Sequence, residues 1–224
     1  MLYLIQINPL NYSYKNYNII GEKAMESNTN KLIWNIKPKE MPLVIRNCNK
    51  CNKKTEFYSS ELFRVNAQKK SLDIWSIYKC SHCNSTWNLT IFSRIPPNSL
   101  KGDLQKRFEN NDKDLIWEYA FNSDILKQNN AEVKYDMEYV VYKDEIDIET
   151  NGQVNILIKC PYNFNLRLNK FLQKHLGIKR KVIDELIEDK IIDLKENIDI
   201  KKYKIKRELE ISIDYEKIKE IISN

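Results

Sequence analysis

The chain has 224 residues, of which 42% are hydrophobic and 30% are charged, and its formal net charge at pH 7 is +6. This length allows one large domain or two to three small ones, and the composition is that of a globular protein with a core. No apolar run is long enough to span a membrane, which excludes a protein built of membrane-spanning helices. We therefore expect a cytoplasmic protein that has no membrane partner.

The charge is distributed unevenly along the chain. Residues 31–95 hold 12 Lys and Arg against 4 Asp and Glu, residues 96–160 hold 8 against 13, and residues 161–224 hold 15 against 12. Two basic ends therefore flank an acidic middle. This asymmetry is compatible with a polyanion-binding surface and also with an ordinary solvated surface, and charge alone does not decide between them.

Residues 1–30 differ from the rest of the chain. The first seven residues are too few for the apolar core of a signal peptide, and they lack a basic leader and a small-residue cleavage site. The Asn-, Tyr- and Lys-rich stretch that follows has no hydrophobic period, so we predict either a disordered tail or an incorrectly assigned start. The second hypothesis places the natural start at Met25, because Gly21-Glu22-Lys23 can be encoded by purine-rich codons that resemble a bacterial ribosome-binding site.

Four of the five cysteines form two CxxC pairs separated by 28 residues. These residues are Cys48, Cys51, Cys80 and Cys83. Two residues between cysteines allow one tight turn to direct both sulfurs at one point, and two such turns supply the four thiolates that Zn²⁺ binds tetrahedrally. Asn52 and Asn84 follow the second cysteine of each pair, and Asn tolerates the left-handed conformation in which such turns often end. We predict a closed, structural zinc site.

Two alternatives to zinc are a thioredoxin-like dithiol and a pair of disulfides. The dithiol requires a CxxC at the start of a helix, whereas both pairs here are flanked by strand-like sequence. The disulfides require an oxidising compartment, and the chain carries no export signal that we recognise. His82 lies between two ligands of a complete four-cysteine shell, so we interpret it as a loop residue and not as a fifth ligand.

Residues 31–95 have the alternating pattern of β-strands around the two cysteine turns. The segments 32–36, 57–66, 72–79 and 86–92 each alternate apolar and polar residues or are rich in strand-forming residues. A turn, two strands, a second turn and a further strand make up a zinc ribbon. The sequence therefore predicts an N-terminal antiparallel ribbon that is too thin to be stable without its metal.

Residues 96–160 are predicted to form a mixed segment of three short helices followed by two strands. Asp112 is placed to cap the second helix, and Ser123 is placed to cap the third. The hydrophobic period then changes from helical spacing to two, which predicts strands over 133–141 and 154–160. The overall fold class is therefore α+β.

Residues 161–224 are predicted to begin with two amphipathic helices, the first over 167–177 and the second starting at 178. Their apolar sides, which include Phe171 and Ile183, should face inward, and short strands should follow. Between 167 and 181 there are six basic residues and no carboxylate. The basic residues are Arg167, Lys170, Lys174, Lys179, Arg180 and Lys181. Three cations at the start of the second helix would form a phosphate site together with the helix dipole, although a solvated basic face has the same pattern.

This order of helix, glycine, basic helix start and short strands resembles the αL RNA-binding motif. That motif occurs in a ribosomal small-subunit protein, in pseudouridine synthases and in bacterial tyrosyl-tRNA synthetases. Arg167-Leu168-Asn169 corresponds to the Arg-Leu-Asp that opens the first helix of the motif, and Lys179-Arg180-Lys181 corresponds to the Ser-Arg-Ser that opens its second. The Glu-Gly that precedes the first strand of the motif is replaced here by Asp189-Lys190. The resemblance implies that these basic residues contact RNA.

A larger part of the chain, from about Lys31 to Asp214, resembles a bacterial family catalogued as domain of unknown function 1062. Three segments carry this resemblance: 63–70 (Phe-Arg-Val-Asn-Ala-Gln-Lys-Lys), Tyr78-Lys79-Cys80 and 86–90 (Thr-Trp-Asn-Leu-Thr). The family implies no activity.

The sequence favours an RNA-binding protein that contains a structural zinc ion. We expect the protein to contact the backbone of structured RNA, either ribosomal RNA or tRNA. The alternative is an adaptor in transcription or translation, in which the zinc ribbon binds another protein and the αL-like unit is degenerate. An enzyme that acts on RNA is a third hypothesis. The four glycines are scattered, the two histidines lie apart, and we find no catalytic constellation.

Overall fold

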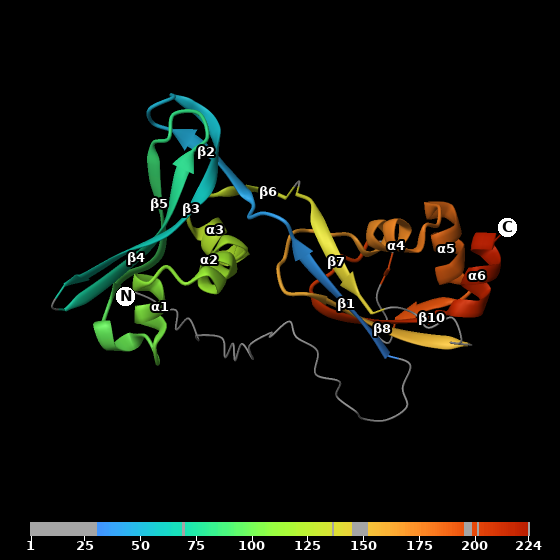
Figure 1. Cartoon of the computed structure of the whole chain (residues 1–224). Coiled ribbons are helices and arrows are strands. Elements are labelled where there is room, and N and C mark those ends of the chain that lie inside the picture. The colour runs from blue at the N-terminus through green and yellow to red at the C-terminus, as the bar shows by residue number, and fades with distance from the viewer. Residues whose placement is uncertain are drawn as a thin grey trace, which may run out of the picture.

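The computed structural model describes residues 31–68, 70–135, 137–144, 152–194, 199–200 and 202–223. Within these residues the chain forms two five-stranded sheets and six α-helices, which confirms the α+β class. Figure 1 shows the two sheets in separate lobes, with the long blue-green strands in one and the red and orange elements in the other. No helix in the described part of the chain is both long enough and apolar enough to cross a membrane.

One sheet, which we name the cysteine sheet, has the strand order β5-β4-β3-β2-β6, and all neighbouring strands are antiparallel. Its strands are β2 (Leu43–Cys48), β3 (Lys53–Gln68), β4 (Ser71–Cys80), β5 (Thr86–Ile95) and β6 (Glu132–Lys134). Strands β3 and β4 form a long hairpin whose register shifts between Ser59 and Leu62. The side chains of β4 alternate strictly between a buried face and a partly exposed face, as its sequence pattern predicts.

Three helices cover the buried face of the cysteine sheet. These are α1 (Leu104–Glu109), α2 (Lys113–Ala120) and α3 (Ser123–Gln128), which follow a 3₁₀ turn, η1 (Pro97–Ser99). Phe108 of α1 is fully buried against Phe63 of β3, with ring centroids 4.8 Å apart, and Leu115 and Ile116 of α2 belong to the same apolar cluster. The helices therefore leave the opposite face of β3, β4 and β5 without a covering helix among the described residues.

Side chains at the helix starts determine where α2 and α3 begin. The Asp112 carboxylate accepts a hydrogen bond from the Leu115 amide at 2.9 Å, which confirms the predicted cap of α2. Arg107 donates to the same carboxylate, and this contact lowers the pKa of Asp112. The predicted cap at Ser123 is wrong by one residue, because the Asn122 side chain accepts from the amides of Asp124 and Ile125 and Ser123 is already helical.

The second sheet, which we name the C-terminal sheet, has the order β7-β1-β8-β10-β9. Its strands are β1 (Lys31–Pro38), β7 (Tyr139–Lys143), β8 (Gln153–Cys160), β9 (Ile192–Leu194) and β10 (Arg207–Asp214). Strands β1 and β8 are parallel, and the other neighbouring pairs are antiparallel. Three helices pack against this sheet: α4 (Leu168–Leu176), α5 (Arg180–Glu188) and α6 (Tyr215–Ser223).

The two predicted C-terminal helices are present with their apolar sides inward. Phe171 of α4 and Ile183 of α5 are fully buried in the core that also contains Ile156 and Ile158 of β8. Gly177 ends α4 in the left-handed conformation with φ 71°, where a side chain would be strained. The hydrophobic period and the glycine therefore located both helices correctly.

Two features of strand pairing differ from the sequence prediction. Strand β1 was predicted to lie with the cysteine strands, but it lies between β7 and β8 in the C-terminal sheet. The single strand predicted over 133–141 is divided into β6 and β7, which belong to different sheets. The acidic middle segment therefore contributes to both lobes. An alternating pattern indicates which face of a strand is buried, but it does not identify the neighbouring strand.

Candidate metal centre and basic surface

Two turns at one end of the cysteine sheet hold the four predicted ligands. Cys48 is the last residue of β2 and Cys80 is the last residue of β4, while Cys51 and Cys83 lie in the turns that follow them. Asn52 and Asn84 both adopt left-handed conformations, with φ of 51° and 56°, as predicted. The antiparallel pairing of β2 and β4 with β3 brings the two turns to the same place.

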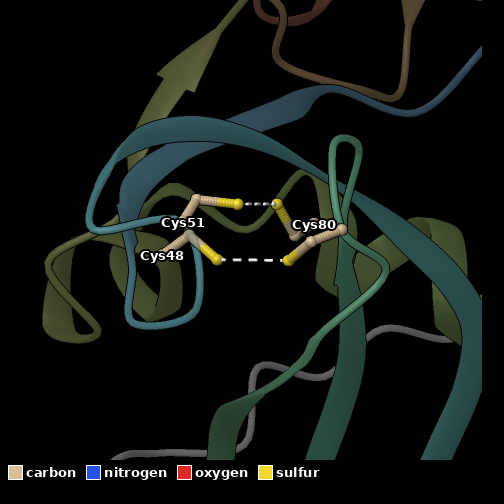
Figure 2. A group of neighbouring side chains, drawn as sticks. Cys48, Cys51 and Cys80 are labelled. Carbon is tan, nitrogen blue, oxygen red and sulfur yellow. Dashed lines mark hydrogen bonds between the residues drawn. The ribbon is translucent and has the colours of Figure 1, made fainter.

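The sulfur atoms of these four cysteines lie within 4.8 Å of one another, close enough to hold a metal ion. Figure 2 shows sulfurs from the two turns pointing toward each other. The Cys48 and Cys83 sulfurs are 3.5 Å apart, and the Cys51 and Cys80 sulfurs are 4.0 Å apart. A tetrahedral site with Zn–S bonds of about 2.3 Å requires sulfurs about 3.8 Å apart, so the observed pairs bracket this distance.

Hydroxyl groups lie against the sulfurs of the cluster. The Ser85 Oγ lies 3.2 Å from the Cys48 sulfur and 3.1 Å from the Cys83 sulfur, and the Thr55 Oγ1 lies 3.3 Å from the Cys80 sulfur. Hydrogen bonds from such groups stabilise thiolates and orient metal ligands. Sequence analysis did not identify either residue, although Ser85 follows the second CxxC pair by only two residues.

The cysteine thiols of the cluster differ in how readily they ionise. The hydrogen bond with Ser85 lowers the pKa of Cys48 to about 6, whereas the hydrogen bond with Cys83 and burial raise the pKa of Cys51 to about 12. One thiolate therefore forms easily, and its charge opposes ionisation of a close neighbour. A bound cation removes this conflict, because it stabilises all four thiolates together.

Arg46 supplies positive charge beside the cluster from within the sheet. Its guanidinium carbon lies 4.0 Å from the centroid of the Trp87 ring. Burial lowers the pKa of Arg46, and a negative charge on Cys48 opposes part of this effect. The Trp87 ring contacts Phe57 and Tyr78, which belong to the buried apolar cluster under the cysteines. An arginine two residues before the first cysteine is the signal that could have identified this residue from sequence.

His82 is exposed in the second turn, with its Nδ1 atom 3.6 Å from the Cys51 sulfur. The four cysteines form a complete shell without it. This position agrees with its interpretation as a loop residue.

All six of the predicted RNA-binding residues are exposed. They are Arg167, Lys170, Lys174, Lys179, Arg180 and Lys181. The last three lie at the start of α5, whose first turn contains no acidic residue. Lys174 lies instead toward β7, with its Nζ atom 4.7 Å from the centroid of the Tyr139 ring. Arg167 precedes α4 and pairs with Lys204 in an isolated β-bridge.

The charges at the start of α5 are only weakly compensated. Arg180 lies 4.0 Å from Asp184 and Lys181 lies 3.8 Å from Glu185, both one helical turn away. The side chains of Arg180 and Lys181 are 69% and 90% exposed, so solvent screens both pairs. The start of α5 therefore combines exposed cations with the positive end of a helix dipole.

His175 of α4 is packed among aromatic rings. Its ring contacts those of Trp34, Tyr139 and Phe171. Burial, together with the nearby Lys143 and Lys174 charges, lowers the pKa of His175 to about 4. The ordinary value of about 6.5 applies to the unfolded chain, so the unfolded chain binds the proton more readily between these values. The native core therefore favours the neutral form of His175 over the protonated form.

We expect this histidine to destabilise the protein as the pH falls from about 6.5 toward 4. Replacing His175 with phenylalanine keeps an aromatic ring and removes the titration, so the variant should lose less stability on acidification than the wild type. Urea unfolding at pH 7 and pH 5 checks this difference. Equal losses in the two proteins would show that carboxylates alone cause the acid sensitivity.

Comparison with known proteins places the chain in a family. A family model described as "Protein of unknown function (DUF1062)" matches residues 65–198. The match covers more than half of the chain, and the protein belongs to this family. It is shorter than the expected region from Lys31 to Asp214, and it includes Cys80 and Cys83 but neither Cys48 nor Cys51. No curated protein and no solved structure matches the chain, and the resemblance to the αL motif receives no support from these comparisons.

Proposed function

We propose that the protein binds structured RNA through the basic C-terminal helix pair and that a structural zinc ion stabilises its cysteine sheet. The exposure of all six basic residues, on helices whose apolar sides are buried, is the observation that carries the proposal for RNA. Burial of Phe171 and Ile183 anchors the two helices in the core and leaves the cations on their exposed sides.

The chemistry of the ligand set favours zinc for the metal. Four thiolates are soft ligands, and a tetrahedral sulfur shell suits Zn²⁺ or iron. Zinc has no redox chemistry, and four protein ligands leave no position for a substrate, so the ion would serve the fold. Arg46 and the Ser85 and Thr55 hydroxyls would offset the negative charge that four thiolates leave on the site.

Phosphate groups fit the start of α5. Lys179, Arg180 and Lys181 are exposed around the first turn, where backbone N–H groups lack partners within the helix. Contacts of this kind recognise the backbone and shape of RNA and do not read base sequence. We therefore infer that affinity comes chiefly from phosphate contacts.

A second candidate function is docking of another protein on the cysteine sheet, as in an adaptor of transcription or translation. Tyr58 and Leu62, on the uncovered face of β3, are 38% and 46% exposed, and large exposed apolar residues are typical of protein interfaces. In this alternative the helix pair would contribute only a solvated surface.

Salt dependence separates the two functions. Zinc-loaded protein titrated against fluorescent structured RNAs should lose affinity as salt rises, with a logarithmic slope close to the number of phosphates contacted. Absence of binding across structured and single-stranded RNAs, at low salt and with zinc present, would overturn the RNA proposal and leave the adaptor.

A further inference from the structure

The face of the cysteine sheet that no described helix covers carries a mixed aromatic, polar and basic surface. Trp75 of β4 lies opposite Arg64 of β3 and Thr90 of β5, so the three side chains share this face. Asn66 lies two residues after Arg64 and Asn88 lies two residues before Thr90, so both are on the same face. We name these residues the Trp75 face; they are Arg64, Asn66, Trp75, Asn88 and Thr90.

The Trp75 face is hollowed beside the indole ring. A shallow depression of about 300 Å³ is lined by Arg64, Val65, Asn66, Trp75 and Asn88. The side-chain oxygen of Asn88 is buried and has no hydrogen-bond partner in the described part of the chain. A buried amide oxygen without a partner is unfavourable, and a ligand with a hydrogen-bond donor would satisfy it.

The charge near this depression is positive. Arg64 is exposed and has no carboxylate partner among the described residues, and Lys79 lies on the same face further along β4. Asp73 lies on the same face and its carboxylate accepts a hydrogen bond from the Arg94 amide at 2.8 Å, so it offsets one of these two positive charges and leaves the other. A partner of this face should therefore carry negative charge.

We infer that the Trp75 face binds a single-stranded segment of RNA, with a base stacked on Trp75 and the adjacent phosphate near Arg64. An aromatic ring on an open sheet, flanked by amides and a cation, supplies the stacking, base-edge and phosphate contacts that unpaired nucleotides require. Leu62 and Ile77 add apolar groups at one end of this face, but Asn66, Asn88 and Thr90 place polar groups beside Trp75. The apolar surface is therefore not continuous, as a protein partner would favour. This inference rests on the proposed RNA-binding function and defines its ligand as RNA with an unpaired segment.

The test compares a fluorescent 12-nucleotide single-stranded RNA with a fully paired RNA hairpin stem, using zinc-loaded full-length protein. Replacing Trp75 with alanine should weaken binding of the single strand roughly 10- to 100-fold, because stacking on one aromatic ring contributes this much. Replacing it with phenylalanine should restore most of the affinity. Binding should also quench tryptophan fluorescence in the wild type, and this quenching should be much smaller in the phenylalanine variant.

Tyr142 provides a matched control, because it is 59% exposed on β7 of the other sheet. Replacing Tyr142 with alanine should leave the affinity for the single strand unchanged. If the Trp75→Ala variant binds the paired stem and the single strand as tightly as the wild type does, the inference is wrong and the RNA proposal stands. If the wild type binds neither RNA, the RNA proposal itself fails. Specific binding of a purified protein on this face, abolished by Trp75→Ala, would also overturn the inference.

Discussion

Replacing Cys80 with serine is expected to remove the metal and unfold the end of the cysteine sheet. Cys80 is fully buried at the end of β4, and its sulfur lies 4.0 Å from that of Cys51 on the opposite turn. Zinc binding contributes about 10–16 kcal/mol to the folding of small zinc domains, so losing one of four ligands removes a large part of the stabilisation. A loss of only about 3 kcal/mol would lower the Tm by about 6–12 °C.

Elemental analysis and thermal unfolding measure this effect. We expect the wild type to contain about one zinc per chain and the Cys80→Ser variant to contain almost none. Cys160→Ser is the matched control, because Cys160 is buried in the C-terminal sheet outside the cluster and its thiol donates to the Tyr162 carbonyl, which a serine hydroxyl can also do. The control should keep its zinc. A wild-type protein that is folded, reduced and free of metal would contradict the account of this site.

Reversing Lys179, Arg180 and Lys181 to glutamate is expected to abolish RNA binding while the fold is retained. These side chains are exposed, so their replacement removes no core packing. The change converts a cluster that attracts phosphate into one that repels it, and carboxylates beside the positive end of α5 are compatible with the helix. If each of the three cations contacts one phosphate, any RNA binding that remains should depend less on salt. The slope of log affinity against log salt concentration should then be shallower by about three.

The matched control for this variant reverses three exposed lysines near the helices of the other lobe: Lys101, Lys106 and Lys113. It changes the net charge of the protein by the same amount, so it distinguishes a local site from general electrostatic attraction. We expect the control to bind RNA with nearly the affinity of the wild type. Equal loss in both variants would indicate non-specific attraction, and undiminished binding by the first variant would place the RNA site elsewhere.

Local features of the fold were predictable from sequence because short-range physics determines them. The CxxC spacing, with Asn52 and Asn84 in left-handed conformations, correctly predicted two facing turns. Helical spacing and Gly177 correctly predicted α4 and α5. In each case the signal lies within about ten residues of chain, where periodicity and turn chemistry apply.

The pairing of distant strands was not predictable in the same way. The parallel pairing of β1 with β8 joins residues more than 120 positions apart, and nothing in the alternation of Leu32, Trp34 and Ile36 specifies that partner. The same limit explains why Thr55 was missed. It reaches the Cys80 sulfur only because β3 and β4 are adjacent, and Thr is an ordinary strand residue.

Crosslinking in cells, followed by sequencing of the bound RNA, tests the central claim most directly. The wild-type protein should recover a defined set of structured RNAs, and the protein with Lys179, Arg180 and Lys181 reversed to glutamate should recover far less of them at equal expression. RNA recovery by the wild type that does not exceed that of the reversed protein would contradict the assignment of RNA binding to this surface.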